Sequence, residues 1–587
     1  MSALWDGVSV LMGQWQLVLG VIAVLVIGQW SVRVILYPIF GDGLTAGEYS
    51  SLGIAGWLAP ALLLSLAWML WGKDHVLPFG MLILIVLILL LRRFKPDDGA
   101  GSVSMNLILP LCVFVSVILR LAYISKAVFP LYFDSAQHYF IAKSIMGNAA
   151  GFAKSVTTYY YHLGFHFLTA SIASILHFEM TRVMLAVGQV VLALIPFSLF
   201  FLVRYETQSN MAGWFAVVLS AFGWFMPAHA VNWGKYPALM SLGLIPFVLG
   251  LALLVWKNHG TLPARRRWSL YGILGVSVLL AVFIHSRSLI VFGIALLAGI
   301  AAAWWRKLPQ GWMYLVLVAV VALLTLEVVL IRQKPILSPL FDPYFDKGIW
   351  VTVPVLCLSL FAWKDHPRFT FASILFVCLL LGSVFIPMTI IPGYRDLTLL
   401  DRPFAEMILF LPLSLLGGLG LAGLENLLQG RFAWGRYIGV VAIGAVAVNA
   451  YFNYNLYPSD CCAIVGNDDV LAMDWMADRL SVEARIGIAS TVLKVMPFES
   501  SEGDVGADAG VWITPLTGRM TFLFPNDAGF DERSTLDGLC ELEIGYLYVG
   551  EAGQPFDADT IFVRPEWYKP LLSMPGTGVY EVVGCDK

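Results

Sequence analysis

The chain has 587 residues, of which 59% are hydrophobic and only 13% are charged. Soluble globular proteins carry about 25% charged residues, so this composition excludes a soluble or nucleic-acid-binding protein and indicates a polytopic membrane protein. The net charge of −3 is unevenly distributed, because residues 453–587 hold 22 acidic and 8 basic residues while the preceding part is net basic.

Apolar runs of membrane-spanning length repeat along residues 1–452. The first run, near Gln16–Phe40, has no basic leader and no clear cleavage site, so we expect it to remain as the first span. Later examples are Val183–Val203, Pro237–Trp256, Met313–Ile331 and Phe404–Leu424. The pattern predicts an all-α transmembrane bundle of about 14 spans.

Short basic loops predict the orientation of the bundle. They are Arg92–Lys95, Arg265–Arg267, Arg306–Lys307, Lys364–Arg368 and Arg431–Arg436. All five lie on one face, assigned to the cytoplasm, if the apolar run of residues 163–178 is an interfacial helix rather than a span. Residues 127–162, 228–236, 285–287, 332–348 and 387–402 then form loops on the outer face.

Residues 453–587 are predicted to form a separate extracytoplasmic α+β domain of a protein in the cell membrane. Asp469–Leu480 has the pattern of an amphipathic helix, and Arg485–Ala489, Gly545–Val549 and Gly578–Val583 have the pattern of strands. The four cysteines of this part, Cys461, Cys462, Cys540 and Cys585, are compatible with disulfides, whose pairing spacing alone does not reveal.

The outer loop 127–162 holds the first candidate residues. Asp134 and His138 are four residues apart and share a face if this segment is helical. An acid at membrane depth usually has a function. His162 and His166 repeat the spacing, although histidine is also at home at a membrane interface. Together these residues would also suit a metal site, but nothing in the sequence shows that the two pairs meet.

The loop 387–402 is the second candidate centre. Its residues Tyr394, Arg395 and Arg402 could grip a lipid phosphate, since a guanidinium donates several hydrogen bonds to phosphate oxygens. The alternative is that Asp396 and Asp401 pair with these arginines. Lys235 and Arg287 are further cations in neighbouring outer loops.

A third segment, Trp512–Arg519 of the C-terminal part, combines an aromatic residue, a glycine and a guanidinium. This combination could lie over a sugar-binding cleft. A turn between two strands explains Gly518 equally well.

This layout resembles the GT-C superfamily of integral-membrane glycosyltransferases. The resemblance rests on the acid Asp134 in the first large outer loop, the apolar helix after it, Arg182 at the start of the next span, the arginine-bearing loop and the C-terminal outer domain. It implies an inverting glycosyltransferase with a polyprenyl-phosphate sugar as donor and a glycan, lipid or protein as acceptor. Asp134 would be the general base, and Arg395 or Arg402 would neutralise the departing lipid phosphate.

The sequence departs from that pattern at one point. Ser135 and Ala136 stand where many members carry a second acid. The need for a divalent cation such as Mg²⁺ or Mn²⁺ therefore stays open, and His138 is expected to take part of the second acid's role. The rival functions are a transporter or flippase of lipid-linked glycans, and a glycan ligase or polymerase.

Overall fold

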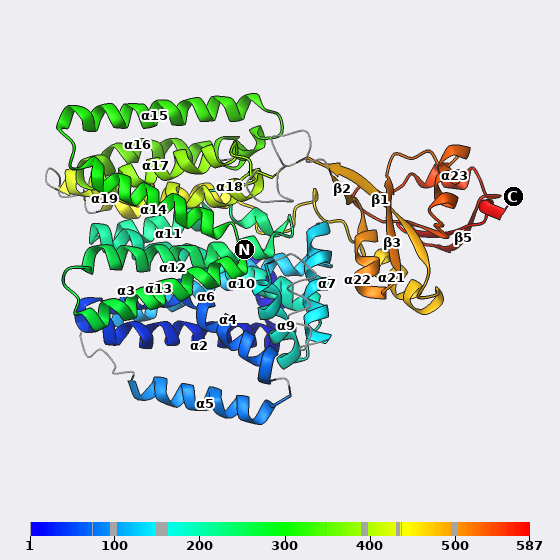
Figure 1. Cartoon of the computed structure of the whole chain (residues 1–587), viewed down its shortest axis with the longest axis horizontal. Coiled ribbons are helices and arrows are strands. Elements are labelled where there is room, and N and C mark those ends of the chain that lie inside the picture. Colours follow the sequence, from blue (N-terminus) through cyan, green and yellow to red (C-terminus); the bar gives the residue numbers. More distant parts are fainter. Residues whose placement is uncertain are drawn as a thin grey trace.

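The computed structural model describes residues 2–72, 74–93, 103–147, 162–346, 348–388, 397–429, 432, 435, 437–494 and 503–586. A bundle of roughly parallel long helices makes up most of the molecule, and a small sheet domain lies against one end of it (Figure 1). We call this end of the bundle the sheet-domain end.

The bundle contains the helices of the first 453 residues. They are α1 (Ser2–Gly13), α2 (Trp15–Phe40), α3 (Ala46–Gly56), α4 (Leu58–Ala67), α5 (Val76–Arg93), α6 (Val103–Leu121), α7 (Phe133–Gly147), α9 (Gly164–Leu176), α10 (Met180–Thr207), α11 (Asn210–Phe222), α12 (Tyr236–Asn258), α13 (Ala264–Ile284), α14 (Ser288–Trp305), α15 (Gln310–Gln333), α16 (Ile349–Asp365), α17 (Pro367–Ser383), α18 (Arg402–Ile408), α19 (Phe410–Gln429) and α20 (Ile438–Asn453).

Eight stretches of helix within the described residues are long and apolar enough to cross a membrane, and counting each of two bent helix pairs as one span raises the number to ten. The chain is therefore a multi-pass membrane protein. Five shorter apolar helices, α9 and α11 among them, fall below the length of a full span. The expected total of about 14 spans stays a prediction.

Helix α10 forms the centre of the bundle. It is buried along its whole spanning stretch, whereas α15 exposes most of its side chains at the periphery. Helices α16 and α19 approach each other closely at Gly420 and Gly423, where a Cβ would stand 2.3 Å from the Leu358 carbonyl oxygen and 2.4 Å from that of Phe361. Small residues allow such backbone contact, on which helix association in lipid depends.

Residues 453–587 form an α+β domain, in which α21 (Asn467–Arg479) precedes a six-stranded mixed sheet. The strands are β1 (Arg485–Leu493), β2 (Gly503–Gly506), β3 (Met520–Pro525), β4 (Tyr546–Val549), β5 (Tyr568–Ser573) and β6 (Gly578–Val582), in the order β2-β1-β4-β6-β5 with β3 parallel to β1. Short helices α22 (Ile513–Thr517), α23 (Arg533–Glu541) and α24 (Ala558–Phe562) complete it. The predicted helix and all three predicted strands are confirmed within a few residues.

The sheet domain docks on α7, the helix that carries Asp134 and His138. Trp512 is fully buried there, with its ring centroid 5.0 Å from that of Phe129 and 5.5 Å from that of Tyr139. On the same helix, Lys143 donates from Nζ to the Pro515 carbonyl oxygen at 3.4 Å. One buried aromatic residue therefore couples the domain to the segment that bears the candidate site.

Replacing Trp512 by alanine should loosen this docking. A buried Trp→Ala change costs about 3–5 kcal/mol, and here much of the loss falls on the contact between the domain and α7. We expect limited proteolysis to release the sheet domain faster from Trp512→Ala than from the unsubstituted protein. Trp567→Ala, a half-buried tryptophan elsewhere in the domain, is the matched control. Equal release rates in the two variants would contradict the docking role.

Candidate functional site

An ion pair between Asp134 and Lys235 lies at the sheet-domain end of the bundle. Asp134 is in the first turn of α7, and Lys235 immediately precedes α12. The Lys235 Nζ contacts Asp134 Oδ2, and the two side chains keep 30% and 19% of their surface exposed, respectively. Among the described residues, Lys235 is the only ion-pair partner of Asp134. The pair is thus open to solvent or to a bound molecule.

Close backbone contacts fix the positions of Asp134 and Lys235 relative to each other. Gly234 has a φ of +63°, and a Cβ there would come within 2.5 Å of the Ser135 Oγ and 2.9 Å of the Ser135 nitrogen. The loop that carries Lys235 therefore lies directly against the first turn of α7. Tyr132, just before that turn, has a φ of +67°, which is unusual for a bulky residue. Its N–H donates to the Cys462 carbonyl oxygen at 3.0 Å.

Two pairs of histidines lie beside the ion pair. His138, one turn after Asp134 on α7, places Nδ1 3.2 Å from Nε2 of His166 on α9. His162 precedes α9 and faces the loop between α13 and α14, where its ring centroid lies 4.3 Å from that of His285 with the two rings tilted, and its Nδ1 accepts from the Ser286 N–H at 3.4 Å. His138 of the first predicted pair therefore contacts His166 of the second pair, whereas His162 contacts His285 and Ser286.

These imidazoles are neutral near pH 7. Burial, with a smaller effect of the positive charge of Lys235, lowers the pKa of His138 to about 3. Burial and then Arg287 lower the pKa of His162 to about 4. Burial also holds the pKa values of His166 and His285 well below the ordinary value. Neutral rings can donate and accept hydrogen bonds without adding charge to the site.

Two arginines supply further positive charge at this end. Arg287 contacts Asp401 Oδ2 through its guanidinium at 2.6 Å, while Asp401 Oδ1 accepts from the Phe404 N–H and caps α18. Arg402 donates to the Ile336 carbonyl oxygen at 3.3 Å, and its Nε is buried without a partner among the described residues. Asp401 therefore pairs with the arginine of another loop.

The pKa of the Tyr132 hydroxyl responds to the charges that surround it. Burial, then the carboxylate of Asp134, raises the pKa of Tyr132, and the cations Lys235 and Arg402 oppose this effect. Arg402 thus acts on the same hydroxyl as the ion pair.

The structure brings together all the predicted site residues that it describes. They are Asp134, His138, His162, His166, Lys235, Arg287 and Arg402. The other two, Tyr394 and Arg395, lie outside the described residues, as does Asp396.

The aromatic and cationic side chains of the segment Trp512–Arg519 do not face a cleft. Trp512 is buried against α7, as described above, and Arg519 is buried as well. The guanidinium of Arg519 donates to the carbonyl oxygens of Ala477 and Leu480 at 2.6 and 2.8 Å. These carbonyls end α21 and need donors, so the cation closes a helix terminus. The interpretation of this stretch as a sugar-binding surface is wrong.

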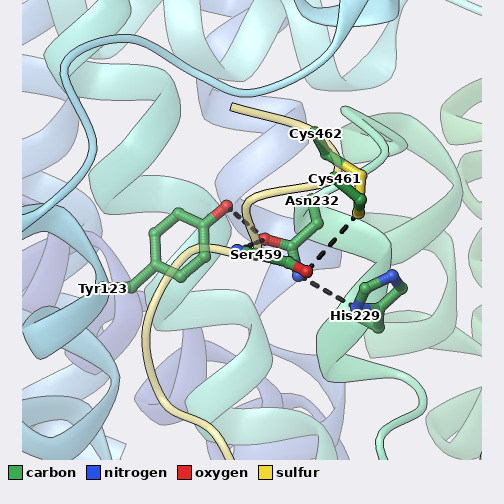
Figure 2. Close-up of a disulfide and its surroundings, with 6 residues drawn as sticks. All are labelled: Tyr123, His229, Asn232, Ser459, Cys461 and Cys462. Atoms are coloured by element: carbon green, nitrogen blue, oxygen red, sulfur yellow. Dashed lines mark hydrogen bonds between the residues drawn. A yellow bond between two sulfur atoms is a disulfide. The ribbon is translucent and has the colours of Figure 1, made fainter. Parts of the chain in front are cut away.

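The sequence alone did not predict the hydrogen bonds of Asn232, which precedes Lys235 in the same loop. The Asn232 side-chain oxygen accepts from the Tyr123 hydroxyl at 3.0 Å and from the Ser459 N–H at 3.1 Å (Figure 2). Asn232 thereby links the loop of Lys235 to the segment that enters the sheet domain. A lone asparagine in a loop gives no sequence signal for such a role.

A cavity of about 490 Å³ lies away from this cluster. Apolar residues of α12, α13, α14 and α17 line most of it, from Val248 to Phe376. None of the predicted site residues that the structure describes contributes to its wall. This cavity is thus separate from the cluster around Asp134.

Comparison with known protein families shows a match over most of the membrane part of the chain. The model of a family described as a family of unknown function (DUF6541) matches residues 44–390, more than half of the chain. This range includes α3 to α17 and the residues of the Asp134–Lys235 pair. No curated protein matches the chain.

The buried imidazoles should make the protein less stable as the pH falls. Their pKa values are lower in the folded protein than the ordinary 6.5, so below pH 6.5 the unfolded chain binds more protons. For His138, the free energy of unfolding decreases by about 1.4 kcal/mol for each pH unit between pH 6.5 and about 3. We expect the unfolding temperature to fall across pH 6.5–4.5, and to fall less steeply in His138→Asn. The exposed His259→Asn is the control; an unchanged slope in His138→Asn would contradict the assignment.

Proposed function

The chain belongs to the DUF6541 family, and we propose that it is a membrane glycosyltransferase of the GT-C type. It transfers a sugar from a polyprenyl-phosphate donor to an acceptor hydroxyl, with inversion at the anomeric carbon. The observation that carries this proposal is the partly exposed Asp134 carboxylate, paired with Lys235 inside a cluster of cations and neutral imidazoles.

Asp134 is the general base in this proposal. Its Oδ2 is held by Lys235, which leaves Oδ1 for the acceptor hydroxyl. The carboxylate takes the hydroxyl proton as the oxygen attacks the anomeric carbon, and the bond from that carbon to the lipid phosphate breaks on the opposite face. A positioned base of this kind contributes about 10²–10⁴-fold to the rate.

The cations receive the departing phosphate. Lys235, Arg287 and Arg402 lie at the starts of three helices at the sheet-domain end, and Arg395 lies outside the described residues. A fixed cation stabilises the negative charge that develops on a leaving phosphate. The donor's anionic head and the electropositive cluster are therefore complementary.

The position of the cluster favours an enzyme over the alternatives. Transporters place their sites near the bilayer midplane between repeated halves. Here the cluster around Asp134 lies at one end of the helices, beside a folded domain. A ligase or polymerase of lipid-linked glycans would use the same chemistry, and donor tests distinguish it by the size of the glycan transferred.

The proposal includes the orientation and the number of spans. If α5, α11, α17 and α20 also cross, the total is about 14, and α9 remains within the outer part of the protein. The basic loops then face the cytoplasm, and the sheet domain faces outward from the cell membrane. The partners are the donor, a glycan, lipid or protein acceptor and the surrounding lipids.

Asp134→Asn should abolish sugar transfer, lowering kcat at least about 10²-fold, because an amide cannot accept the acceptor's proton. Purified protein in nanodiscs is incubated with a panel of polyprenyl-phosphate sugars and membrane glycan extract, and released polyprenyl phosphate is measured. Asp346→Asn changes an exposed carboxylate at the same end and should keep the unsubstituted rate. An unchanged rate in Asp134→Asn would remove this residue from the mechanism.

Arg402→Ala should weaken use of the donor more than use of the acceptor. A hydrogen bond to a charged group contributes about 1.5–3 kcal/mol, so kcat/KM for the donor should fall roughly 10- to 100-fold. The same assay gives this value while the donor concentration is varied. Arg332→Ala, which removes an arginine that lies over the Phe341 ring and makes long contacts to Asp342 and Asp346, is the control. Equal losses for donor and acceptor would rule out a contact between Arg402 and the donor phosphate.

A further inference from the structure

Two adjacent cysteines form a disulfide where the chain leaves the bundle for the sheet domain. Cys461 is exposed and Cys462 is buried, and the bond between them joins neighbours in the sequence (Figure 2). The Ser459 Oγ lies 3.4 Å from the Cys461 Sγ, and since a disulfide sulfur carries no hydrogen, this hydroxyl is the donor. One ring nitrogen of His229 and both sulfur atoms lie within 4.8 Å of one another.

Asn232 determines which nitrogen of His229 carries the proton. The Ser459 N–H donates to the Asn232 Oδ1, so the Asn232 amide group turns its NH₂ toward His229. The distance from that Nδ2 to the His229 Nδ1 is 3.1 Å. Because the amide NH₂ can only donate, Nδ1 accepts, and the proton of the neutral ring is on Nε2. His229 is thus a hydrogen-bond donor through Nε2.

We propose that Cys461–Cys462 is a thiol-exchange site for a small-molecule thiol, with His229 as the donor that stabilises the leaving thiolate. The external thiolate attacks the exposed Sγ of Cys461, forms a mixed disulfide with it and releases Cys462 as the thiolate, to which Nε2–H donates. A second thiol then attacks the mixed disulfide. The balance is one protein disulfide and two thiols giving two cysteine thiols and one external disulfide.

A metal site made of the same three residues is the competing interpretation, since two thiolates and an imidazole suit a soft metal ion. The hydrogen bonds argue against it. A metal on Nε2 requires the ring proton on Nδ1, which would then face the NH₂ group of Asn232, donor against donor.

Thiol exchange at Cys461–Cys462 should affect the segment that carries Asp134, because main-chain hydrogen bonds connect the two. The Cys462 carbonyl oxygen accepts from the Tyr132 N–H at 3.0 Å, and the Cys462 N–H closes a turn onto the Ser459 carbonyl at 3.1 Å. Opening the disulfide frees this turn. We expect the Tyr132 amide to lose protection from hydrogen exchange in the reduced protein.

The second disulfide of the chain, Cys540–Cys585, is a built-in control. It too has one exposed residue, Cys585, and one partly buried residue, Cys540, so access alone does not distinguish the two bonds. Residues 453–587 contain no histidine, so their own sequence supplies no imidazole to this control bond. The two bonds also differ in sequence separation, 1 against 45 residues, so the substitution of His229 below, rather than this comparison alone, isolates the contribution of the imidazole.

The full-length protein is treated with glutathione, quenched with iodoacetamide and analysed by peptide mass spectrometry over time. We expect Cys461–Cys462 to open at least about tenfold faster than Cys540–Cys585, which is modest for a positioned donor, with the mixed disulfide on Cys461. His229→Asn keeps an acceptor at the Nδ1 position and should remove this advantage. His229→Gln, whose amide reaches the Nε2 position, should retain part of it.

Equal opening rates for the two disulfides would overturn the proposal, as would an unchanged rate in His229→Asn. If added Zn²⁺ protects the reduced thiols from alkylation, the site binds a metal and the exchange proposal is wrong. Unchanged exchange of the Tyr132 amide on reduction would refute the coupling to α7. All these measurements are independent of sugar transfer, so they stand or fall separately from the proposed enzyme activity.

Discussion

The ion pair between Asp134 and Lys235 is the interaction on which the arrangement of this end of the molecule depends. Charged side chains near a bilayer are costly unless they are paired or face water, and this pair does both, because each partner is partly exposed. Its geometry needs α7 to begin at Phe133, the tight turn at Gly234 and the contact of that turn with Ser135. These elements belong to two parts of the chain about 100 residues apart, so the pair forms only when the bundle has brought them together.

The sheet domain contributes to that closure without supplying a side chain to the cluster. Trp512 packs on α7 from one side, and the Cys462 carbonyl holds Tyr132 just before the helix starts. Asn232 joins the same linker to the loop that ends at Lys235. The domain therefore supports both partners of the ion pair through backbone and aromatic contacts, which explains why Trp512 is buried.

Local patterns predicted much of this structure, and long-range contacts account for what they missed. The four-residue spacing of Asp134 and His138 put both on α7, and alternating hydrophobicity located β1, β4 and β6. The partner of Asp134 is 101 residues away, and that of Asp401 is 114 residues away. No spacing rule encodes such pairs. His162 shows the limit of periodicity, because it precedes α9 and turns to His285 although it stands four residues from His166.

The balance of charge at the site follows from these contacts and bears on its ligand. Lys235 pairs with Asp134, and Arg287 pairs with Asp401. Arg402 has no ion-pair partner among the described residues, although Asp342 and Glu406 act on it electrostatically. Burial keeps the nearby imidazoles neutral. Within the described part of the chain, the guanidinium of Arg402 therefore lies without a paired carboxylate at an end of the bundle where one acid remains accessible. An uncharged ligand would leave it unpaired, whereas an anionic head group would form an ion pair with it. The donor proposed above, a lipid phosphate bearing a sugar, meets this requirement and would also bring an electrophilic carbon within reach of a carboxylate.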